Sequence, residues 1–117
     1  MSMNLPCIGT AATPYGSASI HVGRYPKGGA IYVQLYTVGD DYPEPLATLS
    51  TNLVPYGTSL ADDEFSVKSW SENAPLIEPL LATGLFEDTG RRTPTGYASA
   101  PTWRIKDPLH VPAPQRR

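Results

Sequence analysis

The chain has 117 residues, with eleven acidic residues, nine basic residues and a single cysteine. A chain of this length forms one domain with its own hydrophobic core, and one cysteine excludes an internal disulfide framework. The sequence pI of about 5.5 argues against direct nucleic-acid binding. No apolar run approaches the roughly eighteen residues that a membrane helix needs. Residues 1–16 lack the basic residues and the apolar run of a secretory signal.

Composition divides the chain into three parts. Residues 1–16 show no periodic pattern and predict a flexible N-terminal arm. Residues 17–106 contain all of the predicted strands and the predicted helix, so we expect a single α+β domain there. Residues 107–117 hold three prolines and two terminal arginines, which predicts a disordered, Pro-rich tail.

Alternation of apolar residues with other residues predicts the strands. In the clearest case, Ile31, Val33 and Leu35 point to one face, and two tyrosines and a glutamine point to the other. The expected strands are residues 17–25, 30–38, 46–53, 64–70 and 102–106. Turn-forming segments separate them, and residues 88–96, with two glycines and one proline, predict a tight loop. We therefore expect a mostly antiparallel sheet of four to five strands.

A short helix is predicted before the last strand. Its apolar stripe has i, i+4 spacing: Leu76, Ile77, Leu80 and Leu81. Ser71 or Asn73 offers an N-cap, and Gly84 stands where a helix C-terminus favours a left-handed residue. Pro79 disturbs a helix interior, so the helix is short or becomes regular only near Leu76. With this helix packed on the sheet, the fold class is α+β.

Acidic residues are concentrated in the middle of the chain. Ten of the eleven lie between residues 38 and 90, where Lys68 is the only basic residue, so this stretch carries a formal charge of −9. Residues 91–117 carry +5 instead. Eight acids lie in or beside predicted loops: Asp40, Asp41, Glu44, Asp62, Asp63, Glu64, Glu87 and Asp88. Either they form one surface that attracts a basic protein, or the fold interleaves the bases with them and they serve solubility.

Aromatic residues supply candidate anchors for a partner. Tyr32 and Tyr36 lie on one face of the same predicted strand, and Trp70 ends another. Tyrosine and tryptophan are favoured at the centres of protein interfaces. We therefore add these three residues to the eight acids as the predicted partner-binding set.

The sequence carries no signature of catalysis, of a metal site or of a cofactor site. Its two histidines and one cysteine lack metal-ligand spacing, and no phosphate-binding glycine loop is present. His21 is the only imidazole outside the Pro-rich tail, and on a strand we expect it at the solvent or at a sheet edge. Arg91 and Arg92 are the best candidates for an anion site, although Glu87 and Asp88 nearby can neutralise them. We expect no catalytic residue, no metal and no cofactor.

The stretch from Leu46 to Ile105 resembles a small family of uncharacterised proteins carried by plasmids, conjugative elements and phages. Five segments carry the resemblance: "PLATLSTNL" (Pro45–Leu53), "DEFSVKSWSEN" (Asp63–Asn73), "LLATGLFEDTGR" (Leu80–Arg91), "PTGY" (Pro94–Tyr97) and "APTWRI" (Ala100–Ile105). The family is a domain of unknown function, so the resemblance implies a genomic setting and no catalytic residues. Small acidic proteins from such elements often disarm host defences by binding, as anti-CRISPR and anti-restriction proteins do.

The resulting hypothesis is a non-enzymatic inhibitor in the cytoplasm of a bacterial host. Its expected partner is a host protein with a basic surface, such as a CRISPR effector subunit or a restriction enzyme, bound through the acidic surface. We expect no direct contact with nucleic acid or membrane. One alternative is an accessory or scaffold protein that forms a homodimer through an exposed sheet edge. Another is an enzyme centred on His21 or on Arg91 and Arg92.

Overall fold

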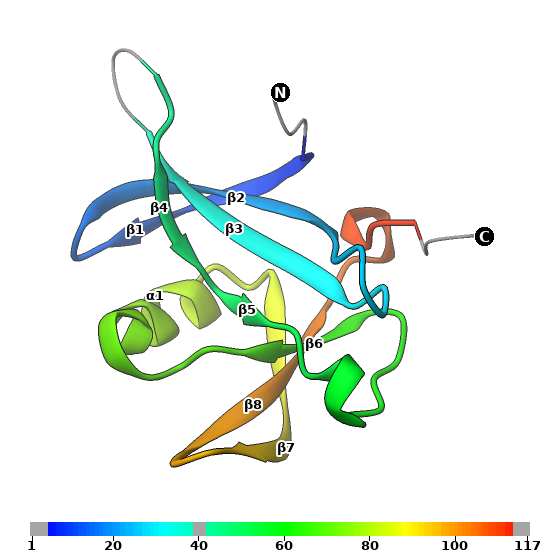
Figure 1. The fold of residues 1–117 in the computed structure, drawn as a ribbon. Helices are drawn as coiled ribbons and strands as arrows, with labels where there is room; N and C mark the ends of the chain where they lie inside the picture. The colour runs from blue at the N-terminus through cyan, green and yellow to red at the C-terminus, as the bar shows by residue number, and fades with distance from the viewer. Residues whose placement is uncertain (1–4, 39–41, 114–117) are drawn as a thin grey trace.

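The computed structural model describes residues 5–38 and 42–113. Its elements in chain order are β1 (Cys7–Thr13), β2 (Gly16–Arg24), β3 (Ile31–Thr37), β4 (Pro45–Thr48), β5 (Ser50–Thr51), the 3₁₀ helix η1 (Val54–Tyr56), β6 (Glu64–Val67), the 3₁₀ helix η2 (Ser71–Leu76), α1 (Ile77–Ala82), β7 (Phe86–Thr95), β8 (Ala98–Ile105) and the 3₁₀ helix η3 (Pro108–His110). Among the described residues, the strands form two antiparallel four-stranded sheets. Sheet A has the order β1-β2-β3-β4, and sheet B has the order β5-β6-β8-β7 (Figure 1).

The predicted α+β class is confirmed, with the difference that two small sheets stand where we expected one. The expected strand 46–53 divides at Leu49 into β4 of sheet A and β5 of sheet B. The Leu49 N–H donates to the Val33 carbonyl at 2.9 Å, while the Leu49 carbonyl accepts from the Lys68 N–H at 2.7 Å. Leu49 therefore bonds to both halves of the molecule, and alternation within the segment could not reveal this change of partner.

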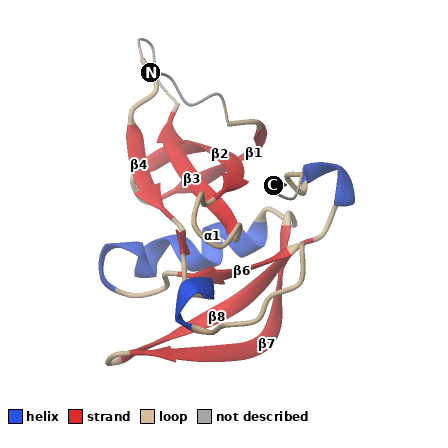
Figure 2. Cartoon of the chain, turned by 45° about the vertical axis from the view of Figure 1, so that its right-hand side comes forward, coloured by secondary structure: helices blue, strands red, loops and turns tan. Residues whose placement is uncertain are grey.

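The core lies between the two sheets and α1 (Figure 2). Sheet A contributes alternating side chains that are almost completely buried: Ile20, Val22, Ile31, Val33 and Leu35. Sheet B contributes Phe65, Phe86 and Trp103, whose ring centroids lie 5.5 to 6.2 Å apart. Edge-to-face and tilted aromatic contacts at these distances are favourable. The apolar alternation read from the sequence thus becomes the inner faces of two sheets.

The helical segment confirms the expected effect of proline. Regular α-helix begins only at Ile77, after the 3₁₀ turn of η2, and Pro79 lies in its first turn, where no intrahelical N–H is required. Neither predicted N-cap is correct, because Trp70 caps η2 without a side-chain bond. Asn73 is buried instead, and its amide donates to the carbonyls of Thr48 and Lys68 at 2.8 and 3.0 Å. That amide links the end of β4 to the end of β6.

Three other expectations differ from the structure. Residues 88–96, predicted as a loop, belong to β7, which runs from Phe86 to Thr95. Because β7 is an edge strand, it accommodates both a bulge at Gly90 and a proline that cannot donate to a ladder. Residues 7–13 of the expected arm form β1, which pairs with β2. Residues 108–110 of the expected tail form η3, and residues 114–117 lie outside the described residues.

Ser71 has a φ of 59°, the only positive φ among the described non-glycine residues. This left-handed conformation costs a side-chain-bearing residue roughly 1–2 kcal/mol. We expect Ser71→Gly to raise the free energy of unfolding by about 0.5–1 kcal/mol, since glycine's greater unfolded-state entropy offsets part of the relief. Ala74→Gly in the same 3₁₀ helix is the matched control and is expected to lower stability. Urea unfolding of both variants checks this, and equal losses would contradict the backbone explanation.

Candidate functional site

A row of alternating charges crosses sheet B. Glu64 of β6 lies opposite Arg104 of β8, and Arg104 lies opposite Glu87 of β7. Arg104 forms an ion pair with Glu87, and Arg91 reaches Glu64. The row therefore reads acid, base, acid across neighbouring strands, and opposite charges in this position attract each other.

A further predicted contact acid, Asp88, is also paired. Arg92 donates to both of its carboxylate oxygens, at 3.0 and 3.1 Å, and the Gly90 N–H donates at 2.9 Å. Arg92 therefore does neutralise its local acid, as the simpler of the two sequence interpretations expected. Arg91 and Arg92 both have carboxylate partners, so an additional anion would have to compete with Glu64 and Asp88.

The remaining predicted acids do not gather at one place. Glu44 directly precedes β4 and Asp62 and Asp63 directly precede β6. The two strands belong to different sheets and begin at distant points of the fold (Figure 1). Asp40 and Asp41 lie outside the described residues. The segregation of charge along the sequence thus gives mixed charge on sheet B, and the described acids do not form one acidic face.

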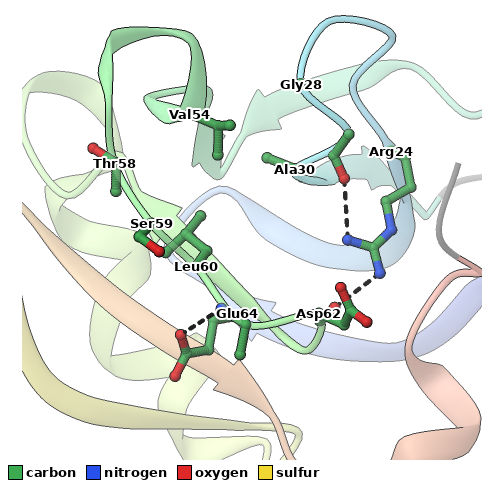
Figure 3. A pocket seen from close by; sticks show the side chains of 11 residues that line it. Arg24, Gly28, Ala30, Val54, Thr58, Ser59, Leu60, Asp62 and Glu64 are labelled. Atoms are coloured by element: carbon green, nitrogen blue, oxygen red, sulfur yellow. Dashed lines mark hydrogen bonds between the residues drawn. The ribbon is translucent and has the colours of Figure 1, made fainter.

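Arg24, the last residue of β2, reaches the loop at Asp62. Its guanidinium donates to the carbonyls of Gly29, Asp62 and Pro112 at 3.1, 2.8 and 2.9 Å. Burial lowers the pKa of Arg24, and the charge of Asp62 opposes that shift. Figure 3 shows Arg24 between the turn at Gly28 and the loop at Asp62, at the side of a hollow of about 260 Å³. Nη1 and Nη2 bond to carbonyls of three separate segments, so Arg24 acts as a structural tie, while its Nε is buried without a partner among the described residues.

The face of sheet A opposite the core carries uncharged polar and aromatic side chains, of which Gln34 is buried and the others are half-buried. We call this group the outer face of sheet A: Ser19, His21, Tyr32, Gln34, Tyr36 and Thr48. Strand register sets Ser19 opposite Tyr36, and His21 opposite Gln34, which in turn lies opposite Thr48. All six point away from the core side chains that alternate with them.

Hydrogen bonds hold the Gln34 side chain at the centre of this face. Its Oε1 accepts from the Tyr32 hydroxyl at 2.8 Å and from the Thr48 hydroxyl at 2.6 Å. Its Nε2 donates to the Leu35 carbonyl at 3.1 Å. The Tyr32 ring also packs edge-on against Tyr25 at 5.2 Å. Burial raises the pKa of Tyr25, whose hydroxyl lies 3.0 Å from Ser50 Oγ.

His21 is fixed on both ring nitrogens. Nδ1 lies 2.9 Å from the Leu5 carbonyl, which can only accept, so Nδ1 carries the proton. In the neutral ring Nε2 then accepts from the Ser19 hydroxyl at 2.9 Å. The Tyr36 ring meets the imidazole edge-to-face at 4.9 Å. We expected His21 at the solvent or at a sheet edge, but it is half-buried on the central strand β2 and orders its neighbours.

The structure therefore brings together the two predicted tyrosines and adds partners that sequence reasoning missed. Tyr32 and Tyr36 share a face, as their spacing predicted. Ser19 and His21 could have been found from antiparallel pairing of β2 with β3, which sets their side chains beside the tyrosines. Trp70 is half-buried, and among the described residues no hydrogen bond or ring contact joins it to either tyrosine.

In the described ranges, no three His, Cys, Asp or Glu residues gather as a metal site would need. No helix in residues 5–38 and 42–113 combines the length and apolar character required to cross a membrane. Comparison with protein-family models, with curated proteins and with solved structures finds no match to this chain.

The ion pair of Glu64 gives a pH-dependent prediction. The hydrogen bond from Arg91 lowers the pKa of the Glu64 carboxyl below 4.5, and the Ala61 N–H and the charge of Arg104 contribute. Because the folded-state pKa is below the unfolded-state pKa, the ionised carboxylate stabilises the fold above pH 4.5. That stabilisation is lost as the pH falls through the folded-state pKa.

We expect Glu64→Gln to lower the free energy of unfolding by about 1 kcal/mol at neutral pH. At about pH 3 the loss is expected to be smaller, because the unfolded-state carboxyl is then largely protonated and ionisation of Glu64 contributes less to folding. Glutamine still accepts from the Ala61 N–H, so the comparison isolates the charge. Urea unfolding at both pH values measures the difference, and an equal loss at both would show that the charge is not the cause.

Proposed function

We propose that this protein is a non-enzymatic inhibitor, of the anti-CRISPR or anti-restriction kind, that binds a nucleic-acid-handling host protein. The observation that carries the proposal is the outer face of sheet A, which offers aromatic rings and uncharged hydrogen-bonding groups on a rigid sheet. The sequence resemblance to proteins of plasmids and phages supports the inhibitory setting. The target is expected inside the bacterial cell, where such host defences act.

The chemistry of this face suits a protein partner. Tyrosine combines a large apolar ring with a polar hydroxyl and has few rotatable bonds, so it is effective in interfaces. Tyr32 and Tyr36 are half-buried, which leaves part of each ring for contact. Val38, 54% exposed, continues the same row past the end of β3. The face therefore offers apolar area together with a small number of placed polar groups.

Preorganisation strengthens this interpretation. The Tyr32 hydroxyl, the Gln34 amide and the Thr48 hydroxyl are already bonded to one another, and His21 orients the edge of the Tyr36 ring. Side chains that are held before binding lose less conformational entropy when a partner docks, roughly 0.5–1.5 kcal/mol less for each side chain already ordered. Such a site supports tight binding from a modest area.

The role of the acids is reduced in this proposal. Glu64, Glu87 and Asp88 are neutralised by arginines, so they contribute little field to attract a basic partner. Glu44, directly before β4, remains a candidate contact beside this face, whereas Asp62 and Asp63 directly precede β6 of sheet B. A basic target surface is therefore a secondary feature, and the central contact is made by the tyrosines.

A protection assay tests the proposed function. The protein is expressed in bacterial strains that each carry one defined CRISPR or restriction system, and phage plating is measured. The wild type is expected to restore plating against at least one system, and the Tyr36→Ala variant to lose this effect. Tyr97→Ala, which removes an equally large ring from the exposed β7–β8 turn, is the matched control and is expected to protect. Protection by Tyr36→Ala at the wild-type level would exclude the outer face, and no protection by the wild type against any system would overturn the inhibitory function.

A further inference from the structure

The edge of sheet A formed by β1 differs from the other described sheet edges. Strand β5 has two residues, and β4 has four and begins with a proline. Strand β7 is interrupted by a bulge and carries one proline and four charged residues: Glu87, Asp88, Arg91, Arg92 and Pro94. Proline, charge, bulges and short length all discourage pairing with another strand. The seven residues of β1, CIGTAAT, contain neither a charge nor a proline, and the one irregularity in its pairing, between Cys7 and Gly9, leaves residues 9–13 in regular register with β2.

Along the edge that faces away from β2, the backbone of β1 has hydrogen-bonding groups that a further strand could pair with. Thr13 and Gly16 close the two-residue turn to β2, so they form a hydrogen-bonded pair, and by alternation Ala11 also bonds toward β2. Thr10 and Ala12 then direct their N–H and carbonyl groups outward. Apart from its ladder with β2, β1 makes no backbone hydrogen bond to any described residue. The side chains of Thr10 and Ala12 are exposed as well.

We propose that β1 pairs antiparallel with β1 of a second copy of this chain, with Thr10 facing its own counterpart on the two-fold axis. In this register Ala12 lies opposite Ile8, and Ala11 lies opposite Gly9. Ala11 and Gly9 both lie on the core-facing side of β1, so the core-facing sides of the two sheets remain on the same side of the combined sheet, whereas Ile8 lies at the irregular point of β1 and packs against the core. The outer faces of both copies then also lie on one side.

A second copy fits this edge better than an unrelated strand for two reasons. An antiparallel pair of identical strands is symmetric, so a single contact closes into a dimer and leaves no further β1 edge open. Because β1 is uncharged, its self-pairing brings no like charges together, whereas self-pairing of β7 would appose charged side chains.

One strand pair buries less than the roughly 1,200 Å² of a standard stable interface, so the dimer is expected to be concentration-dependent. In light scattering under reducing conditions, the mass is expected to rise from 12.6 kDa toward twice that value as the concentration increases. A mass of one chain at every concentration would overturn the proposal. A monomer that pairs this edge with a strand of the host partner would give that result and would equally overturn it.

Charged substitutions at Thr10 test whether the two copies pair through β1. Thr10→Lys and Thr10→Glu each place like charges on the two-fold axis, and each alone is expected to weaken dimerisation at least tenfold. An equal mixture of the two variants is expected to recover the dimer, because lysine then faces glutamate. Ser99→Lys and Ser99→Glu, on the exposed side of β8, change the net charge equally and are expected to dimerise like the wild type. Dimerisation unaffected by the Thr10 variants, or no recovery in the mixture, would overturn the assignment to β1.

An engineered disulfide between the two copies tests the proposed register of the β1–β1 pair. Thr10→Cys in a Cys7→Ala background brings the two sulfurs together on the axis, where paired Cα atoms lie about 5.5 Å apart, within disulfide range. Mild oxidation is expected to cross-link this variant almost completely at concentrations where the wild type dimerises. Ser99→Cys in the same background is the control for random collision and is expected to cross-link far less. Equal cross-linking of both variants would overturn the proposed register.

Discussion

Replacement of Trp103 by alanine is expected to lower the free energy of unfolding by about 3–5 kcal/mol, the largest stability effect that we predict. Trp103 is 0% exposed and contacts Phe65 and Phe86, with ring centroids 6.2 and 5.7 Å away. Alanine would remove most of these contacts and leave a cavity among residues that cannot collapse fully. Urea unfolding followed by circular dichroism measures the loss.

Two variants sharpen this prediction. Trp103→Phe keeps an aromatic ring and removes an indole N–H that is buried without a partner among the described residues, so its cost is expected to be below about 2 kcal/mol. Tyr97→Ala at the exposed β7–β8 turn is expected to change stability by less than about 0.5 kcal/mol. Similar losses for Trp103→Ala and Tyr97→Ala would show that the aromatic cluster is not the centre of the core.

The double variant Tyr32→Ala/Tyr36→Ala is expected to weaken binding to the host target at least 100-fold. Central aromatic residues of an interface each contribute about 2 kcal/mol or more when truncated to alanine, and two such losses exceed that factor. Titration calorimetry with the target identified by the protection assay gives the affinity, and circular dichroism confirms that the variant remains folded.

A conservative variant and a remote variant distinguish the contribution of the tyrosine rings to binding from that of other parts of the molecule. Tyr36→Phe keeps the ring against His21 and is expected to bind within about threefold of the wild type. Glu87→Gln/Asp88→Asn, which removes two acids of sheet B, is expected to do the same. If the acid variant lost binding while the double tyrosine variant kept it, the contact surface would lie on sheet B.

Much of this fold follows from local pattern. Alternation predicted β2, β3 and β6, and it assigned Ile31, Val33 and Leu35 to one buried face. The proline rule correctly delayed the start of the regular helix to Ile77. These features depend on neighbours within a few residues, and so the sequence contains them directly.

The missed features depend on partners far along the chain. Leu49 changes sheets because Val33 and Lys68 bond to it from opposite sides, and no periodicity within its own segment records this. Strand β7 persists through Gly90 and the following proline because only one of its edges must pair, with β8. Expected loops can thus be strands when they lie at the edge of a sheet.

Charge was the least predictable property of the site. The acids are segregated along the sequence, but antiparallel pairing sets Arg104 between Glu64 and Glu87, and the bulged β7 turns Arg91 toward Glu64. Linear distance between charges therefore says little about the surface they form. The tyrosines were more predictable, since their common face follows from the two-residue period of a single strand.

The salt dependence of target binding distinguishes contact through the uncharged outer face of sheet A from contact through charged groups. The affinity of the wild-type protein for its host target is measured from about 50 to 500 mM sodium chloride. Contacts made by aromatic and neutral polar groups are weakly screened, so we predict a change in Kd of less than about threefold. A weakening of more than about tenfold over this range would show that charge attraction dominates binding and that the outer face of sheet A does not make the main contact.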